Sequence, residues 1–181
     1  LYINETPILS TSVETAEMIK YASNSFLALK ISYINEIANL CEAVGADVHQ
    51  VAKAMGLDGR ISPKFLHPGP GFGGSCFPKD THALAATGRK NNSPLPTIEA
   101  AIKTNVSQKT RMVGKLKGLV SDFNGKTIAV LGLAFKPQTD DVREAASKVV
   151  VSELVKFGVT VNAYDPIATE NFKNHFPDIN Y

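Results

Sequence analysis

The stretch 126-KTIAVLGL-133 divides the chain into two parts of different character. It is a short, continuous apolar run next to the polar turn 121-SDFNGK-126, and such a run is typical of a buried parallel strand. Residues 145–157 have the apolar spacing of a helix, and 159-VTVNAYD-165 is a second strand-like run. Together these segments predict a β-loop-α-β unit, the building block of a doubly wound parallel sheet. The apolar side of its helix is predicted to carry Val149, Val150, Leu154 and Val155.

Residues 121–181 hold only one such unit, and two parallel strands are too few to make a sheet that is stable by itself. We therefore expect a truncated α/β, Rossmann-like unit in the C-terminal part of the chain. The chain also begins with leucine instead of an initiator methionine. Both features lead us to expect a fragment of a longer protein.

The residues before position 121 predict an all-helical unit. The capping-box pattern Thr11–Glu14 precedes an apolar helical repeat without glycine or proline until Gly45, which predicts a helix of roughly thirty residues. A helix that long in a small domain is typical of a scaffold or of a dimer interface. Its apolar positions are Met18, Ile19, Ala22, Phe26, Leu29, Ile34, Ile37 and Leu40.

Three further helices are expected in this unit. Asp47 is a candidate N-cap for a short helix, and Asp80 is a candidate N-cap for the next one. The last helix is long: it begins at Pro94 or Pro96 and extends to about Val120. The N-terminal unit is thus predicted to contain four helices.

Composition narrows the class of protein. The 181 residues carry a formal charge of +2, which is too small to indicate a nucleic-acid partner or a membrane surface. No apolar run reaches the ~18–20 residues of a membrane span, and 1-LYINETPILS-10 lacks the pattern of a secretion signal. Cys41 and Cys76 are the two cysteines, far apart and outside any Cys/His cluster. We therefore expect reduced thiols, a cytoplasmic protein and no metal site.

Cys76 lies within the glycine- and proline-rich segment 68-PGPGFGGSCFPKD-80. Glycines let a backbone take positive φ and approach a ligand closely, and the N–H groups freed in this way bind anions such as phosphate. A thiol beside such donors, with Lys79 close in sequence, is favoured as a thiolate. Asp80 lies four residues on, within reach as a base or an orienting group. A catalytic thiol and a buried structural cysteine both remain open on these residues.

Two further places have side chains suited to anionic ligands. Lys20 and Asn24 share a face of the long helix and are suited to stabilise an oxyanion, although a solvated face is the alternative and Lys30 is a comparable lysine. Lys136 and Arg143 follow the first strand, where open α/β sheets bind ligands, so this loop is a candidate phosphate site. The histidines are scattered and predict no catalytic or metal site: His49, His67, His82 and His175.

Three stretches resemble the UDP-glucose/GDP-mannose dehydrogenase family. The segment 71-GFGGSCFPKD-80 resembles the family's catalytic-cysteine motif, 16-AEMIKYASNSFLALKISYINE-36 is similar to its central helix, and 130-VLGLAFKPQTDDVRE-144 is similar to the opening of its C-terminal nucleotide-binding domain. The resemblance implies a central helical dimerisation domain over residues 1–120 and part of a UDP-binding domain over residues 121–181. It also implies that the family's N-terminal NAD-binding domain is absent from this sequence.

The resemblance implies an NAD-dependent, four-electron oxidation of the C6 alcohol of UDP-glucose to a carboxylate, in a cytoplasmic homodimer joined through the long central helix. It further implies a thiohemiacetal and then a thioester on Cys76. The form of residues 75–80 favours UDP-glucose, while GDP-mannose and UDP-N-acetyl sugars remain alternatives. The isolated chain is expected to be inactive, and a non-catalytic dimerisation module is the alternative reading of it. No nucleic acid, membrane or metal is implied.

Carried over by position, the resemblance assigns Cys76 as the nucleophile and Asp80 as the group that activates or orients water. Lys20 and Asn24 would stabilise oxyanions and contact the substrate, which favours Lys20 over Lys30. Lys79 and Arg143 would contact NAD. Further substrate contacts are expected from Arg60 of a neighbouring subunit, from Lys136, and from the backbone of Phe65, Leu66, His67, Pro68, Gly69 and Gly73.

Overall fold

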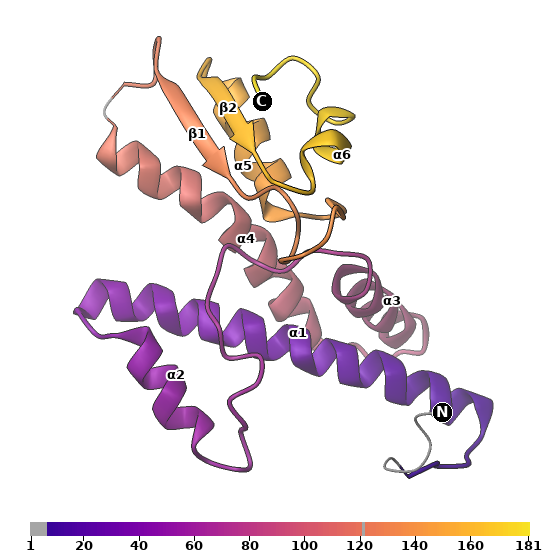
Figure 1. Ribbon diagram of the computed structural model, residues 1–181. Helices are drawn as coiled ribbons and strands as arrows, with labels where there is room; N and C mark the ends of the chain where they lie inside the picture. Colours follow the sequence, from indigo (N-terminus) through magenta and orange to yellow (C-terminus); the bar gives the residue numbers. More distant parts are fainter. Residues whose placement is uncertain (1–6, 121) are drawn as a thin grey trace.

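The computed structural model describes residues 7–120 and 122–181, which form six helices and two strands (Figure 1). The helical unit, residues 7–120, contains α1 (Val13–Val44), α2 (Val48–Gly56), α3 (Phe77–Lys90) and α4 (Pro96–Leu119). The C-terminal unit, residues 122–181, contains β1 (Thr127–Leu131), α5 (Ala146–Lys156), β2 (Thr160–Tyr164) and α6 (Thr169–Lys173). The predicted fold class, a helical unit followed by a small parallel α/β unit, is confirmed.

Helix α1 is the predicted long helix, with 32 residues. Its N-cap is Ser12, whose side chain accepts a hydrogen bond from the Thr15 N–H at 3.3 Å, so the predicted cap at Thr11 is one residue too early. At the other end Gly45 takes φ +74° and its N–H donates to the Cys41 carbonyl. Glycine adopts this left-handed conformation at low cost, which explains why the helix ends where the first glycine occurs.

The buried side of α1 coincides only in part with its predicted apolar stripe, from which Ile34 is fully buried. The helix packs against α3 and α4 through small and polar side chains such as Asn24, Ser25 and Ser32. Five of the eight apolar residues that predicted the helix are instead exposed: Met18, Ile19, Ala22, Phe26 and Leu40. Apolar side chains in a row on an exposed helix face are suited to a protein contact, but the predicted homodimer through α1 stays a prediction.

Helix α3 begins earlier than predicted. Its N-cap is Cys76 and its first turn contains Pro78, whose missing N–H is not needed there. Asp80 is therefore not the N-cap: it lies inside the first turn, and its backbone N–H donates to the Cys76 carbonyl at 2.9 Å. This shift places the thiol and the carboxylate on one face, one helical turn apart.

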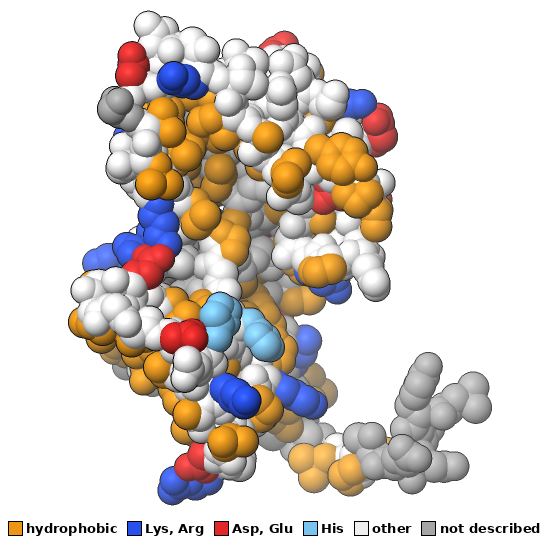
Figure 2. All heavy atoms as spheres, turned by 60° about the vertical axis from the view of Figure 1, so that its left-hand side comes forward, with side chains coloured by type: hydrophobic (Ala, Val, Ile, Leu, Met, Phe, Trp, Pro, Cys, Tyr) orange, Lys and Arg blue, Asp and Glu red, His pale blue; other side chains and the backbone are white. Residues whose placement is uncertain are grey.

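The sheet consists of β1 and β2 paired in parallel, in register from Thr127↔Thr160 to Leu131↔Tyr164. Helix α5 covers one face, but its buried side differs from the prediction, because Val151 is fully buried while Val155 is exposed. The prediction that the first strand is buried is also wrong within this chain. Among the described residues only β2 pairs with β1, and Leu131 is 77% exposed. Figure 2 shows hydrophobic side chains on the upper half of the molecule, the half formed by this unit.

Asp165, at the carboxyl end of β2, holds the C-terminal unit together. Its carboxylate accepts hydrogen bonds from the backbone N–H groups of Leu133 at 2.8 Å, Ala134 at 3.2 Å, Ile167 at 2.9 Å and Ala168 at 2.8 Å. Burial alone would raise the pKa of Asp165, but these four hydrogen bonds outweigh it and lower the pKa to about 2. The carboxylate thereby ties the loop after β1 to the end of β2.

Asp165→Ala is expected to destabilise the C-terminal unit by about 3–5 kcal/mol, because it leaves four backbone donors without their acceptor. The folded-state pKa is lowered, so the contribution of Asp165 is complete above the ordinary value of 3.8 and is lost as pH falls from there to about 2. Urea unfolding at pH 7 and at pH 2 measures both effects. Asp178→Ala, at an exposed position, is the control, and an equal loss in the two variants at pH 7 would contradict the prediction.

In the described residues no helix combines the length and the hydropathy needed to cross a membrane.

Candidate active site

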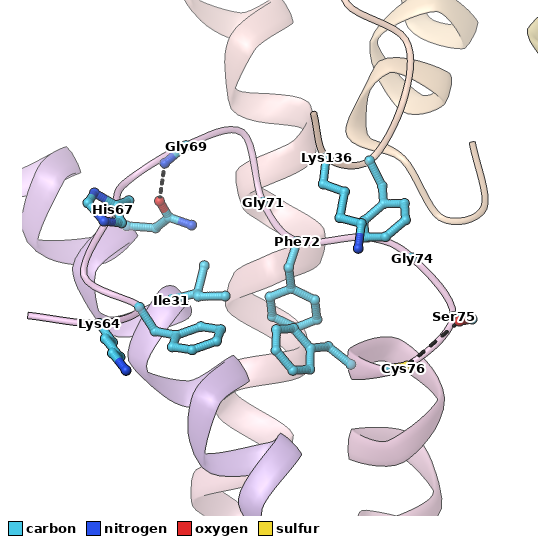
Figure 3. Close-up of a pocket in the computed structure, with 15 residues that line it drawn as sticks. Ile31, Lys64, His67, Gly69, Gly71, Phe72, Gly74, Ser75, Cys76 and Lys136 are labelled. Atoms are coloured by element: carbon cyan, nitrogen blue, oxygen red, sulfur yellow. Dashed lines mark hydrogen bonds between the residues drawn. The ribbon is translucent and has the colours of Figure 1, made fainter. Parts of the chain in front are cut away.

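A cavity of about 720 Å³ lies between the helical unit and the C-terminal unit. Figure 3 shows Lys64 and His67 at one end, Cys76 at the other, Phe72 between them, and Lys136 reaching over from the C-terminal unit. The rings of Phe65, Phe72 and Phe77 pack edge to face along it, with centroids 5.9 Å apart in each pair. The cavity is therefore elongated, mostly apolar along its length, and carries a thiol at one end and a cation above.

The cysteine loop, residues 68–76, forms one wall of this cavity. Its glycines are required where the C-terminal unit lies against it: a Cβ on Gly73 would lie 2.4 Å from the Glu144 carbonyl oxygen, and one on Gly74 would lie 2.7 Å from the Phe135 ring. The Gly74 N–H also donates to the Arg143 carbonyl at 2.8 Å. The two units thus meet directly at the loop that carries the thiol.

Gly73→Ala tests this contact. The added methyl group has no room against the Glu144 carbonyl, so the variant is expected to lose about 1–3 kcal/mol of stability and to lower any Cys76-dependent activity at least tenfold. Gly59→Ala is the matched control, since a Cβ there meets nothing within 4 Å. Thermal unfolding of both variants gives the comparison. Equal melting temperatures would contradict the prediction, because they would show that the loop accommodates the methyl group without loss of stability.

Buried amide side chains from α1 and α4 hold the backbone of the cysteine loop. Asn35 accepts from the Gly69 N–H at 2.8 Å and Gln108 donates to the Gly69 carbonyl at 2.9 Å. Asn105 binds both backbone groups of Phe72, accepting from its N–H at 2.7 Å and donating to its carbonyl at 3.1 Å. Sequence reasoning missed these three amides. The available signal was the occurrence of polar residues at the inward positions of two long helices.

Cys76 has a free, exposed thiol, and the Ser75 Oγ lies 3.8 Å from its Sγ. Because Cys76 is the N-cap of α3, its side chain lies at the positive end of a helix macrodipole, which favours an anion there. The buried-cysteine alternative does not apply to this residue. It describes Cys41 instead, which is buried within α1.

Asp80 is 2% exposed and lies one turn further along α3. Asn24 donates to it at 2.5 Å, and Lys79 also donates to it and pairs with it. Burial alone would raise the pKa of Asp80, but the hydrogen bonds from Lys79 and Asn24, together with the charges of Lys79 and Lys20, outweigh it and lower the pKa. The carboxylate is therefore ionised at neutral pH. Asn24 and Lys20 thus act on a carboxylate that lies one helical turn from Cys76.

Lys30, the lysine that resembled Lys20 in sequence, has a different environment. Its ammonium donates to the carbonyls of Ile61 at 2.8 Å and Ser62 at 3.3 Å. Lys30 thus fastens the turn after α2 to α1, while the charge of Lys20 acts on Asp80.

A second hollow, of about 450 Å³, shares Gly74 and Ser75 with the main cavity. Its charged lining residues are Lys79 from the helical unit and Arg143 and Glu144 from the C-terminal unit. The Arg143 guanidinium lies 2.6 Å from Asp141, which lowers the pKa of Asp141 to about 2, and the same contact raises the pKa of Arg143. Two cations from different units suit an anionic ligand such as the pyrophosphate of a dinucleotide.

Some predicted binding residues lie apart from these cavities. Arg60 points into solvent, with its side chain 90% exposed, and pairs with Asp58 at 2.6 Å. Leu66 is buried, and neither Leu66 nor Pro68 lines the main cavity. Three predicted catalytic residues line neither cavity: Lys20, Asn24 and Asp80. The predicted residues that do line the main cavity are Phe65, His67, Gly69, Gly73, Cys76 and Lys136. In residues 7–120 and 122–181 no three His, Cys, Asp or Glu side chains gather to hold a metal ion.

Two family profiles cover most of the chain. Residues 14–107 match the central domain of the UDP-glucose/GDP-mannose dehydrogenase family, and residues 129–181 match the UDP binding domain of the same family. The two matches lie on either side of the junction between the helical unit and the C-terminal unit.

Individual relatives agree with these profiles. The chain is 55% identical over 162 residues to UDP-glucose 6-dehydrogenase TuaD of Bacillus subtilis, a match that covers 90% of this chain and 35% of that protein. It superposes with a TM-score of 0.95 and 40% identity on a UDP-glucose dehydrogenase from Pyrobaculum islandicum, covering 98% of this chain and 41% of the other. An NDP-N-acetyl-D-galactosaminuronic acid dehydrogenase from Methanosarcina mazei superposes with a TM-score of 0.77 and 32% identity, covering 87% and 36%. The chain thus spans well under half the length of each.

Proposed function

The chain belongs to the UDP-glucose/GDP-mannose dehydrogenase family, and on that premise we propose that the full-length protein oxidises UDP-glucose to UDP-glucuronate with NAD⁺ as cofactor. The exposed thiol of Cys76 carries this proposal, because it lies at the end of an elongated cavity with an ionised carboxylate one helical turn away. Residues 1–120 would then act as the central domain and residues 121–181 as the beginning of the UDP-binding domain.

The position of the thiol sets the orientation of the substrate. The reacting C6 of the sugar must lie at Cys76, so the nucleotide extends along the cavity toward Lys64 and His67. Lys136 lies above this path and supplies a cation for the diphosphate. Backbone groups of the loop from Phe65 to Gly69 and of Gly73 would contact the nucleotide sugar. Arg60 is exposed and does not line this cavity, which agrees with a role in the site of a neighbouring subunit.

The hollow beside the cysteine loop would hold part of the cofactor, through Lys79 and Arg143. Two NAD⁺ molecules, bound there one after the other, would each accept one of the two hydrides that leave C6. The hollow and the main cavity share Gly74 and Ser75, so ligands in both approach the same segment of backbone. This arrangement supports a reaction in which sugar, thiol and cofactor meet.

The thiolate of Cys76 acts between the two oxidations. It attacks the C6 aldehyde, a C–S bond forms, and the carbonyl oxygen becomes an oxyanion that Lys20 and the Asn24 amide would stabilise. Loss of the second hydride leaves a thioester. Water then attacks the acyl carbon while Asp80 accepts its proton, and the C–S bond breaks to return the thiolate. A thiolate suits both steps because it is a strong nucleophile and a good leaving group.

The choice of nucleotide sugar is tested by following NADH production by the full-length protein with UDP-glucose, GDP-mannose and UDP-N-acetyl sugars. We expect turnover with UDP-glucose and two NADH for each sugar consumed. Activity with only another nucleotide sugar would keep the mechanism and change the substrate. One NADH for each sugar would contradict the four-electron reaction.

For the 181-residue chain alone we propose a different result. It spans 35% of the length of the Bacillus subtilis relative, so we expect it to lack most of the groups that hold the cofactor and to leave NAD⁺ unreduced. We also expect it to form a dimer through the exposed apolar side chains of α1. Cys76-dependent NADH production by the purified chain, or a monomer in analytical ultracentrifugation, would contradict these expectations.

A further inference from the structure

Lys109 is a buried lysine at the junction of three parts of the fold. It comes from α4, its side chain is 8% exposed, and its ammonium donates to the Glu144 carbonyl at 2.9 Å. The Glu144 carboxylate lies 3.7 Å from the same nitrogen. Burial lowers the pKa of Lys109, and Glu144 offsets part of that effect. A buried ammonium is costly, so its contacts must compensate for the lost hydration.

The stem of Lys109 touches the cysteine loop. A Cβ on Gly71 would lie 3.1 Å from Cγ of Lys109, so this glycine makes room for the lysine as it passes. The lysine therefore packs with its methylene groups on the loop that carries Cys76 and binds with its ammonium to the C-terminal unit. No other buried charged side chain described in the helical unit bonds to the C-terminal unit in this way.

The ammonium binds the strap, residues 143–145, where its backbone is least relaxed. Glu144 takes φ +51°, a left-handed conformation that disfavours a residue with a side chain. One residue earlier, the Arg143 carbonyl accepts from the Gly74 N–H, and the Arg143 side chain lines the hollow proposed for the cofactor. Fixing the Glu144 carbonyl therefore fixes the strap against the cysteine loop.

We propose that Lys109 is a positioning residue: it holds the strap on the cysteine loop and so sets the placement of Arg143 relative to Cys76. Its kinetic consequences rest on the proposed dehydrogenase function. The expected change in the reactivity of the Cys76 thiol does not depend on that function, because it follows from the placement of Arg143 alone. Lys109 has no part in the chemistry itself, since it lines neither the main cavity nor the hollow proposed for the cofactor.

The test compares three variants of the full-length protein. Lys109→Met keeps the stem and removes the ammonium, Lys109→Arg keeps a cationic donor, and Lys115→Met removes an exposed lysine of the same helix that pairs with Glu42. Loss of a hydrogen bond to a charged group predicts about a tenfold to hundredfold loss in kcat/KM for NAD⁺ in Lys109→Met, mainly through KM. We expect Lys109→Arg to recover most of that loss and Lys115→Met to behave as the unmodified protein.

The second readout is the rate at which iodoacetamide alkylates Cys76, followed by mass spectrometry of its peptide, with buried Cys41 as the internal reference. We expect Lys109→Met to change this rate at least threefold and Lys109→Arg to restore it. Unchanged alkylation and an unchanged KM for NAD⁺ in Lys109→Met would overturn the proposal, as would equal effects in Lys115→Met. If Lys109→Met does not fold, the same two measurements on Lys109→Gln decide. If neither the unmodified protein nor any variant oxidises a nucleotide sugar, the proposed function fails. The alkylation rates would still test whether Lys109 positions the strap.

Discussion

Cys76→Ser in the full-length protein is expected to lower the net rate of UDP-glucuronate formation by about 10³-fold or more. A serine hydroxyl stays protonated near neutral pH, and an alkoxide is a much poorer leaving group than a thiolate. The fold is expected to tolerate the change, because the Cys76 residue is exposed and the Ser75 Oγ lies 3.8 Å from its sulfur.

Initial rates of NADH production and the amount of UDP-glucuronate formed give the measurement. Binding of UDP-glucose by isothermal titration is expected to change by less than about threefold, since the substitution removes reactivity and little contact area. Cys41→Ala, at the buried cysteine of α1, serves as the control that keeps normal turnover. A serine variant with turnover within tenfold of the unmodified protein would mean that the thiol in this loop is structural.

Asp80→Asn is expected to lower kcat by about 10²- to 10⁴-fold, the usual contribution of a general base. An amide cannot accept the proton of the attacking water, so hydrolysis of the thioester should become the slow step. Rapid-quench experiments should then show an early burst of NADH followed by slow release of product. Asp178→Asn is the control, because this aspartate is exposed.

The pH dependence of Asp80 follows from its lowered pKa. The carboxylate is ionised at every pH above its ordinary value of 3.8, so its protonation should not limit kcat between about pH 5 and pH 9. Its contribution to stability is likewise present above 3.8 and is lost as pH falls through the lowered folded-state pKa. A loss of kcat near pH 6 that disappears in Asp80→Asn would contradict this assignment, as would a variant that turns over within threefold of the unmodified protein.

The local pattern of the sequence predicts most of the secondary structure. The four helices of the first unit and the β-loop-α-β order of the second both follow from apolar spacing, glycine and proline. The errors occur where a local rule competes with another. Asp80 has the chemistry of an N-cap, but Pro78 already fits the first turn of a helix, so α3 begins at Phe77. The apolar run of β1 predicts a buried strand, yet the run alone does not specify what covers its second face.

The candidate site is predictable only in part. Its reactive residues belong to a recognisable sequence motif, while the residues that position them do not. Cys76 and Asp80 lie in one short motif whose glycines, thiol and carboxylate indicate chemistry without any knowledge of the fold. The buried amides and Lys109 act on this motif from about 33 to 39 positions away along the chain, through contacts that the fold creates. Nothing in the local sequence of α4 separates Lys109 from its exposed neighbours. Their roles become visible only when the helices are packed.

The most direct test of the thiol's role is to trap the acyl group on it. The full-length protein carrying Asp80→Asn would be mixed with UDP-glucose and NAD⁺, quenched in acid, digested and analysed by mass spectrometry. We predict that the peptide with Cys76 gains the mass of a UDP-glucuronyl group, and that hydroxylamine removes this group. UDP-glucuronate formation at a normal rate, with Cys76 unmodified at every quench time, would contradict the account.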